Sequence, residues 1–352
     1  MKFIKAFKQE NIGCGYLYFY IHFITEIACF YFLTKVTNGS KIIWLIPFIY
    51  DGLAFVPQSL IGYINDLHPK FKSGLIGTLL LVISYIIYLL SNNIIISLII
   101  LCLGNALLHI SGAENTLRNS NGKLSHPAIF VGGGSFGVIT GRLLVNVVNP
   151  IIIIFLILTI IPFILLADTY TNYNIKETNY NYINKKINLN LIVFLTVFIV
   201  IVRGYMGYGI PTSWNKTTLQ SIILFFSMGI GKCLGGILSD AYGIKKVSTI
   251  STLLAIPFLC CGNNIMIISL IGVLMFSMTM SITLAILSSV YKTKPGLAFG
   301  FTTIGLFLGT APIFFIKINQ TINIIFIISL SIICCIILNL LLKDGDNNGN
   351  NI

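Results

Sequence analysis

The sequence predicts an all-α integral membrane protein with twelve transmembrane helices in two pseudo-symmetric six-helix bundles. Three observations support this prediction. Of the 352 residues, 56% are hydrophobic and only 9% are charged, whereas soluble domains have roughly 25% charged residues. Polar breaks divide the chain into twelve apolar stretches of a length that suits helices crossing a bilayer core about 30 Å thick. A short motif also occurs twice, about half a chain length apart.

The first half of the chain contains six of these apolar stretches. The expected helices are 14–34, 42–64, 73–91, 94–112, 126–147 and 149–167. The N-terminal lysines ahead of an apolar stretch are typical of a signal peptide, but His22 and Glu26 interrupt that stretch and no small-residue cleavage site follows. We therefore expect a retained first span.

The longest polar break, 168–188, lies near the middle of the chain and is rich in Asn and Tyr. Its composition predicts a cytoplasmic linker with no role beyond tethering. The helices expected after it are 189–210, 216–238, 246–262, 264–290, 296–316 and 321–342. The chain thus divides into an N-terminal bundle (1–167), the linker, and a C-terminal bundle (189–352) that ends in a short cytoplasmic tail.

The basic residues favour one orientation, because cytoplasmic loops hold the excess of Lys and Arg. With the N-terminus inside, fifteen basic residues are cytoplasmic and only four (Lys35, Lys41, Lys216 and Lys317) are outside. We expect a plasma-membrane protein with both termini in the cytoplasm. Basic loops facing an anionic leaflet explain the net charge of +12, so a nucleic-acid partner is not expected.

Several other classes of protein lack support in the sequence. The eight cysteines fall in apolar segments without metal-ligand spacing, so neither disulfides nor a structural metal site is expected. The four histidines (His22, His68, His109 and His126) are scattered, which argues against an enzyme. No nucleotide-binding loop is present, so transport would depend on a gradient rather than on a cofactor or ATP. We expect a monomer.

The repeated motif is LIGYINDLHPKFKS at 60–73 and LGGILSDAYGIKKV at 234–247. A glycine in such a motif lets helices approach closely. An aspartate just past a helix end can meet the positive N-terminus of another helix, and such a contact would be made and broken as two halves rock. The residues concerned are Gly62, Asp66 and Lys72 in the first copy and Gly236, Asp240, Lys245 and Lys246 in the second.

This doubled motif and the twelve-helix pattern resemble the major facilitator superfamily. The second copy fits the family's loop signature better, because Pro69 replaces the usual glycine in the first. The resemblance implies two bundles that rock around a central site. More loosely, the stretches 107–118 and 128–144 resemble helices 4 and 5 of fosmidomycin-resistance-type efflux transporters. The chain departs from that pattern at Ile110 and Arg142, where a proline is usual.

Five charged residues fall inside the expected spans: Glu26, Asp51, Arg142, Arg203 and Lys232. A charge near the bilayer centre costs about 2.5–3.5 kcal/mol, so such residues usually face a partner or a cavity. His22 precedes Glu26 by one helical turn and lies on the same face. These two form a candidate proton site, with Asp51 as a second candidate. A permanent ion pair of Glu26 or Asp51 with Arg142 is the structural alternative.

Together these residues predict a secondary active transporter that moves a small solute by alternating access. Arg142 in one half and Arg203 with Lys232 in the other would hold a small organic anion, and a carboxyl group would carry a coupling proton. Tyr205 and Tyr208 add hydrogen-bonding groups near Arg203 in a glycine-rich helix end. A drug/proton antiporter and a membrane sensor that binds without translocating remain open alternatives.

Overall fold

The computed structural model describes residues 12–38, 44–170, 177–316 and 318–343. Within these residues, twelve helical stretches are long and apolar enough to cross a membrane, which identifies a multi-pass membrane protein and confirms the all-α prediction. Leu90 and Ile95 are 83% and 72% exposed, as expected for apolar side chains that face lipid. The N-terminal lysines, residues 171–176 of the expected linker and the tail beyond residue 343 lie outside the described residues.

The first six spans come from the part of the chain before the linker. They are α2 (Ile12–Thr37), α3 (Leu45–Phe55) continued by α4 (Gln58–Leu67), α5 (Ser73–Ser91), α6 (Ile94–Arg118), α7 (Ser125–Leu144), and α8 (Pro150–Leu158) continued by α9 (Ile160–Tyr170).

The other six spans follow the linker. They are α10 (Leu189–Gly209), α11 (Thr218–Tyr242), α12 (Ile244–Cys261), α13 (Met266–Ser277) continued by α14 (Thr279–Val290), α15 (Pro295–Thr310) with the 3₁₀ turn η1 (Ala311–Phe314), and α16 (Gln320–Leu341).

The second span differs from the single helix expected at 42–64, because it is broken between α3 and α4. Pro57 has no backbone N–H to donate and therefore interrupts the helical hydrogen bonding. Two side chains bond to carbonyl groups beside the break: Gln58 Nε2 donates to Ala54 O (2.9 Å), and Thr303 Oγ1 of α15 donates to Phe55 O (3.0 Å). The break thereby becomes a contact point between α4 and α15.

The fourth span, α6, runs six residues beyond its expected end at 112. Residues 113–118 include Glu114, Asn115 and Arg118, whose polarity favoured a loop. In the structure Glu114 and Arg118 are buried and bonded to each other and to their neighbours. Burial of a charge costs less free energy when it is paired and hydrogen-bonded, which lets the helix continue.

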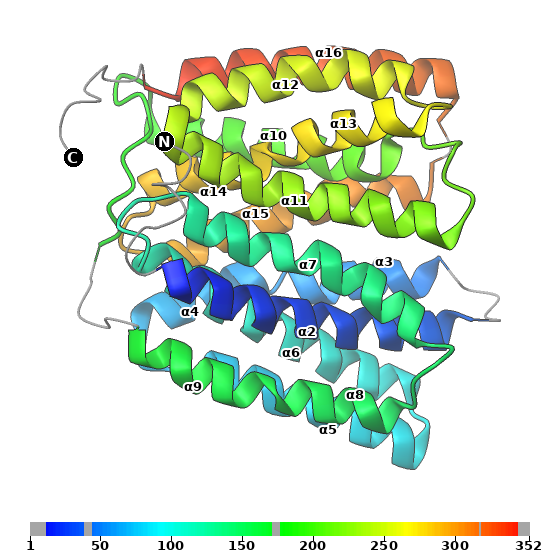
Figure 1. The fold of residues 1–352 in the computed structure, drawn as a ribbon. Helices are drawn as coiled ribbons and strands as arrows, with labels where there is room; N and C mark the ends of the chain where they lie inside the picture. Colours follow the sequence, from blue (N-terminus) through cyan, green and yellow to red (C-terminus); the bar gives the residue numbers. More distant parts are fainter. Residues whose placement is uncertain (1–11, 39–43, 171–176, 317, 344–352) are drawn as a thin grey trace.

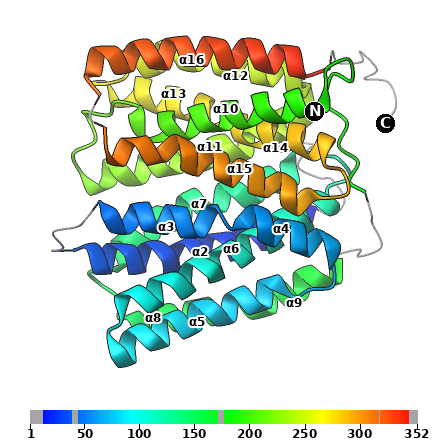
Figure 2. The same cartoon turned by 180° about the vertical axis from the view of Figure 1, so that it is seen from behind.

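The helices form two groups that lie one above the other in Figure 1. Helices α2–α9, the N-terminal half, fill the lower part, and α10–α16, the C-terminal half, fill the upper part. Figure 2 shows the same division from behind. The main contacts between the halves are α7 on α11 and α4 on α15. We call these two contacts the seam.

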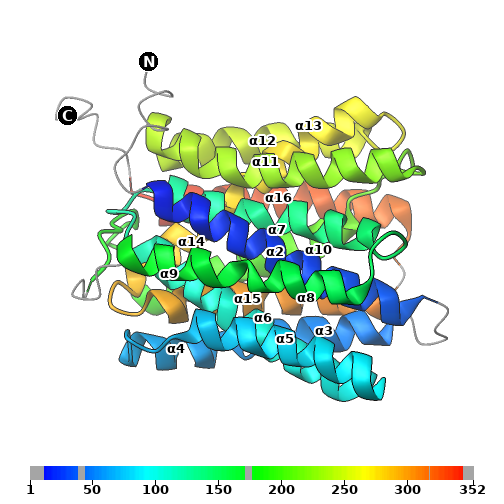
Figure 3. The same ribbon diagram turned by 60° about the horizontal axis from the view of Figure 1, so that its bottom comes forward.

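The start of α2, the end of α16 and the linker (177–188) lie at one end of the molecule, on the left in Figures 1 and 3. We call this end the linker side. The loops α4–α5, α6–α7, α11–α12 and α14–α15 lie at the same end, because consecutive spans alternate in direction. Asp66 and Asp240 of the repeated motif make their hydrogen bonds across the seam at this end.

The linker is more than a tether, contrary to its prediction from composition. Tyr180 is fully buried, and its hydroxyl donates to Lys123 O (3.0 Å). Tyr182 donates its hydroxyl to Gly122 O (2.7 Å), while its backbone nitrogen donates to Ser289 Oγ of α14 (3.1 Å). The described part of the linker therefore bonds to both halves.

Candidate functional site

Asp240, the aspartate of the second motif copy, lies in the last turn of α11 and contacts the start of α7. Its two carboxylate oxygens accept hydrogen bonds from the backbone nitrogens of Leu124 (2.8 Å) and Ser125 (2.9 Å). Free N–H groups at a helix start carry partial positive charge and favour an anion. A residue of the C-terminal half therefore caps a helix of the N-terminal half.

Asp66, in the first motif copy, makes the same contact in the opposite direction. Its oxygens accept from the backbone nitrogens of Gly296 (3.0 Å) and Leu297 (2.8 Å), at the start of α15. The side chain of Asp66 is fully buried. The two aspartates thus form a reciprocal pair of caps across the seam, which we call the double cap.

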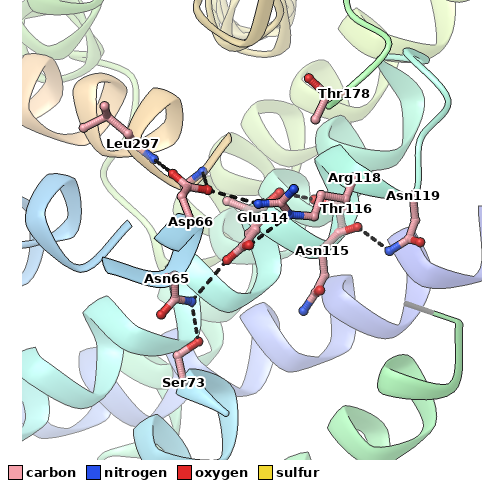
Figure 4. A network of polar contacts seen from close by, with 12 residues as sticks. Asn65, Asp66, Ser73, Glu114, Asn115, Thr116, Arg118, Asn119, Thr178 and Leu297 are labelled. Carbon is pink, nitrogen blue, oxygen red and sulfur yellow. Dashed lines mark hydrogen bonds and ion pairs between the residues drawn. The ribbon is translucent and has the colours of Figure 1, made fainter. Parts of the chain in front are cut away.

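A buried charge network supports the cap that Asp66 makes on α15 (Figure 4). Arg118 Nη2 lies 3.4 Å from Asp66 Oδ1, and Arg118 Nε donates to Glu114 Oε1 (2.9 Å). Asn65 Nδ2 donates to Glu114 Oε2 (3.2 Å) and to Ser73 Oγ (2.8 Å). One guanidinium therefore links two carboxylates, which is the arrangement that makes buried charges tolerable.

The motif glycines set the distance between the helices that the double cap joins. A Cβ on Gly62 would collide with the backbone of Gly296, and a Cβ on Gly236 would collide with Leu124 O and the side chain of Ala128. Glycine is thus needed in each motif copy so that the capped helix start can approach. The matching roles of Gly62 and Gly236 explain why the sequence repeats both residues at one spacing.

The motif lysines lie around the double cap on the linker side. Lys72 Nζ is 2.6 Å from Asp168 Oδ2 near the end of α9, so it links two elements of the N-terminal half. Lys245 is half-buried and Lys246 is exposed in the first turn of α12. Between α11 and α12, Gly243 has a φ of +93°, a conformation that glycine adopts without strain.

Glu26 is the centre of a second, deeper cluster, which we call the His–Glu–His cluster. Its Oε1 lies 3.3 Å from His109 Nε2 of α6 and 3.7 Å from His22 Nε2 of its own helix. Asn105 Nδ2 also donates to this oxygen (3.3 Å). The expected proximity of His22 and Glu26 is confirmed, and His109 joins them from a distant part of the sequence.

Asp51 on α3 is only 6% exposed. Its carboxylate makes no hydrogen bond or ion pair with any residue in the described ranges. Glu26, Cys102 and Tyr208 lie within its electrostatic reach. Tyr208 belongs to α10 of the C-terminal half and is 57% exposed. Among the described residues, Asp51 is therefore a buried carboxyl group without a hydrogen-bond or ion-pair partner, with groups of both halves in its electrostatic reach.

Arg142 lies at the seam on the end of α7 opposite the linker side. Its guanidinium stands over the ring of Phe30 on α2 (5.2 Å to the centroid) and over Phe225 on α11 (5.3 Å). Its side chain is exposed, and Tyr208 lies within its electrostatic reach. Among the described residues, neither Glu26 nor Asp51 lies within 4 Å of the Arg142 guanidinium. The alternative of a permanent ion pair is therefore not supported.

The two basic residues expected from the C-terminal half differ in position. Lys232 on α11 is half-buried, and its charge reaches Glu26 and His109 across the seam. Arg203 on α10 is 8% exposed and stands over Phe276 of α13 (5.6 Å). It lines a small pocket of about 20 Å³ with residues of α12 and α16, such as Thr252 and Ser331. Arg203 thus lies inside the C-terminal half, away from Arg142.

Tyr205, which was expected beside the solute, also faces the interior of the C-terminal half. Its hydroxyl donates to Asn323 Oδ1 of α16. Of the residues expected to hold an anion, Arg142 and Tyr208 lie within electrostatic reach of each other, whereas Tyr205 and Arg203 contact other helices of the C-terminal half. Sequence reasoning missed Asn105, Glu114 and Arg118 as partners in the clusters. The signals that could have indicated them are two pairs at i,i+4 spacing on one apolar span, Asn105 with His109 and Glu114 with Arg118.

No protein-family model matches the sequence, and no curated protein sequence matches it significantly. Solved structures do match the fold. The human organic anion transporter MFSD10 (TETRAN) matches with a TM-score of 0.64 at 13% identity, covering 94% of this chain and all of that one. A variant of the Escherichia coli fucose:proton symporter FucP matches with a TM-score of 0.60 at 13% identity, covering 96% of this chain and 98% of that one.

Both matched proteins are transporters rather than enzymes, and both are covered almost end to end. The narrower resemblance to fosmidomycin-resistance-type transporters gains no support from these matches. At this level of identity the likeness concerns the fold, and it agrees with the twelve spans and the doubled motif. This chain has the fold of the major facilitator superfamily.

Proposed function

We propose that the chain is a secondary active transporter that moves a small organic anion by alternating access, coupled to a proton. The double cap is the observation that supports this most strongly. It joins the two halves only at the linker side, through four hydrogen bonds between carboxylates and backbone amides. Bonds of this kind, between a charged and a neutral group, contribute about 1.5–3 kcal/mol each, so solute and proton binding can offset the cost of opening them.

The linker side is proposed to face the cytoplasm. Eleven basic residues of the described ranges lie at its loops and helix ends, and three lie at the opposite end. The positive-inside rule assigns the more basic side to the cytoplasm. The three are Lys35, Arg142 and Lys216. The eleven are Lys70, Lys72, Arg118, Lys123, Lys185, Lys186, Lys245, Lys246, Lys292, Lys294 and Lys343.

Asp51 is the residue that we propose for the coupling proton, ahead of Glu26. Glu26 accepts from Asn105 and lies beside two imidazoles, whereas Asp51 is buried without any such partner among the described residues. A carboxyl group that is buried alone is stable in its neutral form. Opening of the seam would expose Asp51 to water and allow it to release that proton.

The anion is proposed to bind between Arg142 and Tyr208. Both side chains are exposed, they come from opposite halves, and they lie within electrostatic reach of each other. A guanidinium can bind a carboxylate through two parallel hydrogen bonds, and a tyrosine hydroxyl can donate a third. Lys232, deeper at the seam, adds positive charge on the path toward the linker side. The name of the matched human protein, an organic anion transporter, agrees with this class of solute.

Transport by reconstituted protein tests the proposal. Proteoliposomes that contain a pH-sensitive dye receive a panel of monocarboxylates, dicarboxylates and sugar acids, and both solute and proton movement are recorded. We expect at least one anion to move protons with the wild-type protein, and Asp51→Asn to exchange that anion without moving protons. Glu177→Gln, which removes an exposed linker carboxylate, is the matched control. A protein that binds an anion but never exchanges it would be a sensor, which would contradict the proposal.

A further inference from the structure

The His–Glu–His cluster brings three metal-ligand atoms together in the N-terminal half. His22 Nε2, His109 Nε2 and Glu26 Oε1 all lie within 4.8 Å of one another. The three side chains are between 5% and 8% exposed. Two of them come from α2 and one from α6, so the cluster is formed by packing rather than by a local sequence motif.

The hydrogen bonds of the two histidines determine which ring nitrogen is free. His22 Nδ1 lies 2.9 Å from Phe130 O, and His109 Nδ1 lies 3.0 Å from Asn105 O. A carbonyl oxygen can only accept, so each Nδ1 must carry the hydrogen. In the neutral imidazole, each Nε2 then presents a lone pair toward Glu26. Histidines that bind metals show this same arrangement, in which a carbonyl group fixes the other nitrogen.

The distances within the cluster suit a shared metal ion better than direct hydrogen bonds. Charge-assisted N–H···O bonds are usually about 2.7–2.9 Å long, but Glu26 Oε1 is 3.3 Å and 3.7 Å from the two Nε2 atoms. Ligand atoms around a tetrahedral ion with bonds of about 2.0–2.1 Å are roughly 3.3–3.4 Å apart. The 3.3 Å between Glu26 Oε1 and His109 Nε2 matches this spacing, the 3.7 Å to His22 Nε2 is slightly longer, and all three atoms lie within 4.8 Å of one another.

We propose that His22, Glu26 and His109 form a binding site for a divalent first-row transition-metal ion such as Zn²⁺. Two imidazoles and one carboxylate suit this class of ion, whereas Mg²⁺ and Ca²⁺ prefer oxygen ligands alone. A fourth coordination position would be taken by water or by solute. The bound ion would join α2 to α6. The proposal goes beyond the proposed transport function and does not depend on it.

The charged groups around the cluster predict how affinity can be tuned. Lys232 of α11 is the cation whose charge reaches Glu26 and His109 from the opposite half, and Asp51 reaches Glu26 from α3. Two aromatic rings pack against the imidazoles: the ring centroids of Phe130 and His22 are 4.8 Å apart, and those of Phe299 and His109 are 6.5 Å apart. Removal of the Lys232 charge should therefore tighten metal binding.

Metal binding by the full-length protein in detergent, without any polyhistidine tag, tests the proposal. Titration with Zn²⁺ should give one ion per chain in the wild-type protein. His22→Gln, His109→Gln and Glu26→Gln should each weaken binding by about 100-fold or more, beyond the roughly 10–100-fold effect of losing an outer-sphere partner. Lys232→Gln should bind several-fold more tightly. The matched controls are His68→Gln at the surface and His126→Gln at the start of α7, which should bind as the wild type does.

X-ray absorption of the Zn²⁺-loaded wild-type protein gives a readout that needs no variant. Two imidazole nitrogens with oxygen ligands at about 2.0–2.1 Å are expected. The site would be overturned if the wild-type protein did not bind Zn²⁺. It would also be overturned if the His22→Gln and His109→Gln variants bound Zn²⁺ as tightly as the wild type does. Because these measurements involve no gradient and no solute, such a result would leave the transport proposal untouched.

Discussion

Asp240 accepts a hydrogen bond from the backbone nitrogen of Ser125, 2.9 Å away and in the other half of the molecule. Asp66 makes the equivalent contact with Leu297 at 2.8 Å, with the roles of the two halves reversed. Each contact requires a helix that ends at the seam and a second helix that begins opposite it. The repeated motif therefore encodes the double cap, which we also call the latch. A single copy could cap only one of the two helix starts, that of α7 or that of α15.

Removal of charge from the latch should favour opening of the linker side. In Asp240→Asn one carboxylate oxygen becomes an amide group that cannot accept, so one bond from the α7 start is lost. We expect the free energy of unfolding to fall by about 1–3 kcal/mol and solute exchange to become slower. Asp168→Asn, which removes a partly exposed ion pair with Lys72, should cost less than about 1 kcal/mol. Equal losses in the two variants would contradict the latch.

A methyl group at Gly236 should separate α11 from the start of α7. The added Cβ meets Leu124 O and Ala128 Cβ, and overpacking of this kind usually costs about 1–3 kcal/mol. Gly207→Ala on α10 is the matched control, because a Cβ there meets nothing within 4 Å. Thermal unfolding of both variants in detergent checks the difference. A Gly236→Ala protein as stable as Gly207→Ala would show that close approach is not required.

The linker tyrosines should protect the linker from proteases. Tyr180→Phe removes the hydroxyl bonded to Lys123 O and Ser120 Oγ, and Tyr182→Phe removes the one bonded to Gly122 O. We expect trypsin to cut the double variant after Lys185 or Lys186 several-fold faster than the wild type. Tyr20→Phe, a hydroxyl change in α2 far from the linker, should have no such effect.

The linker contact should also persist across the physiological pH range. Burial raises the pKa of the Tyr180 hydroxyl well above its usual value, so the neutral, donating form is retained in the folded state. Its contribution to stability is present below the pKa of an unfolded tyrosine, about 10, and is lost only as pH rises further. Trypsin resistance that fell between pH 7 and pH 9 would contradict this.

Loss of the Arg142 guanidinium should weaken solute binding and leave proton coupling intact. The residue is exposed at the seam with no ion-pair partner in the described ranges, so its charge is available to an anion. We expect Arg142→Gln to raise the apparent KM for the transported anion by about tenfold, the loss of one ionic hydrogen bond, with an unchanged ratio of protons to solute. Lys216→Gln on the same side serves as control. A transported cation would refute the assignment.

The spans and the latch could be predicted because they depend on local patterns. Apolar length predicts a crossing helix, and the spacing of Gly236 and Asp240 repeats that of Gly62 and Asp66. The His–Glu–His cluster could be predicted only in part, since the turn of helix between His22 and Glu26 is local but His109 reaches them through the packing of α6 on α2. The predicted end of α6 was wrong. Glu114 and Arg118 pair with each other one helical turn apart, and Asn65 and Asp66 of another span complete their contacts. Arg203 was expected to face the solute. The sequence shows that a charge falls inside an apolar span, but it does not show which neighbouring helix the side chain contacts.

Hydrogen exchange measured by mass spectrometry tests the latch and alternating access most directly. Wild-type protein is compared with an Asp66→Asn, Asp240→Asn double variant. The double cap predicts that backbone amides in 119–128 and 291–298 are protected in the wild type and exchange at least tenfold faster in the variant. Alternating access further predicts slower exchange at the opposite end, in 143–150 and 207–218. Faster exchange on the linker side with no change at the opposite end would mean loosened loops and would contradict two halves that rock.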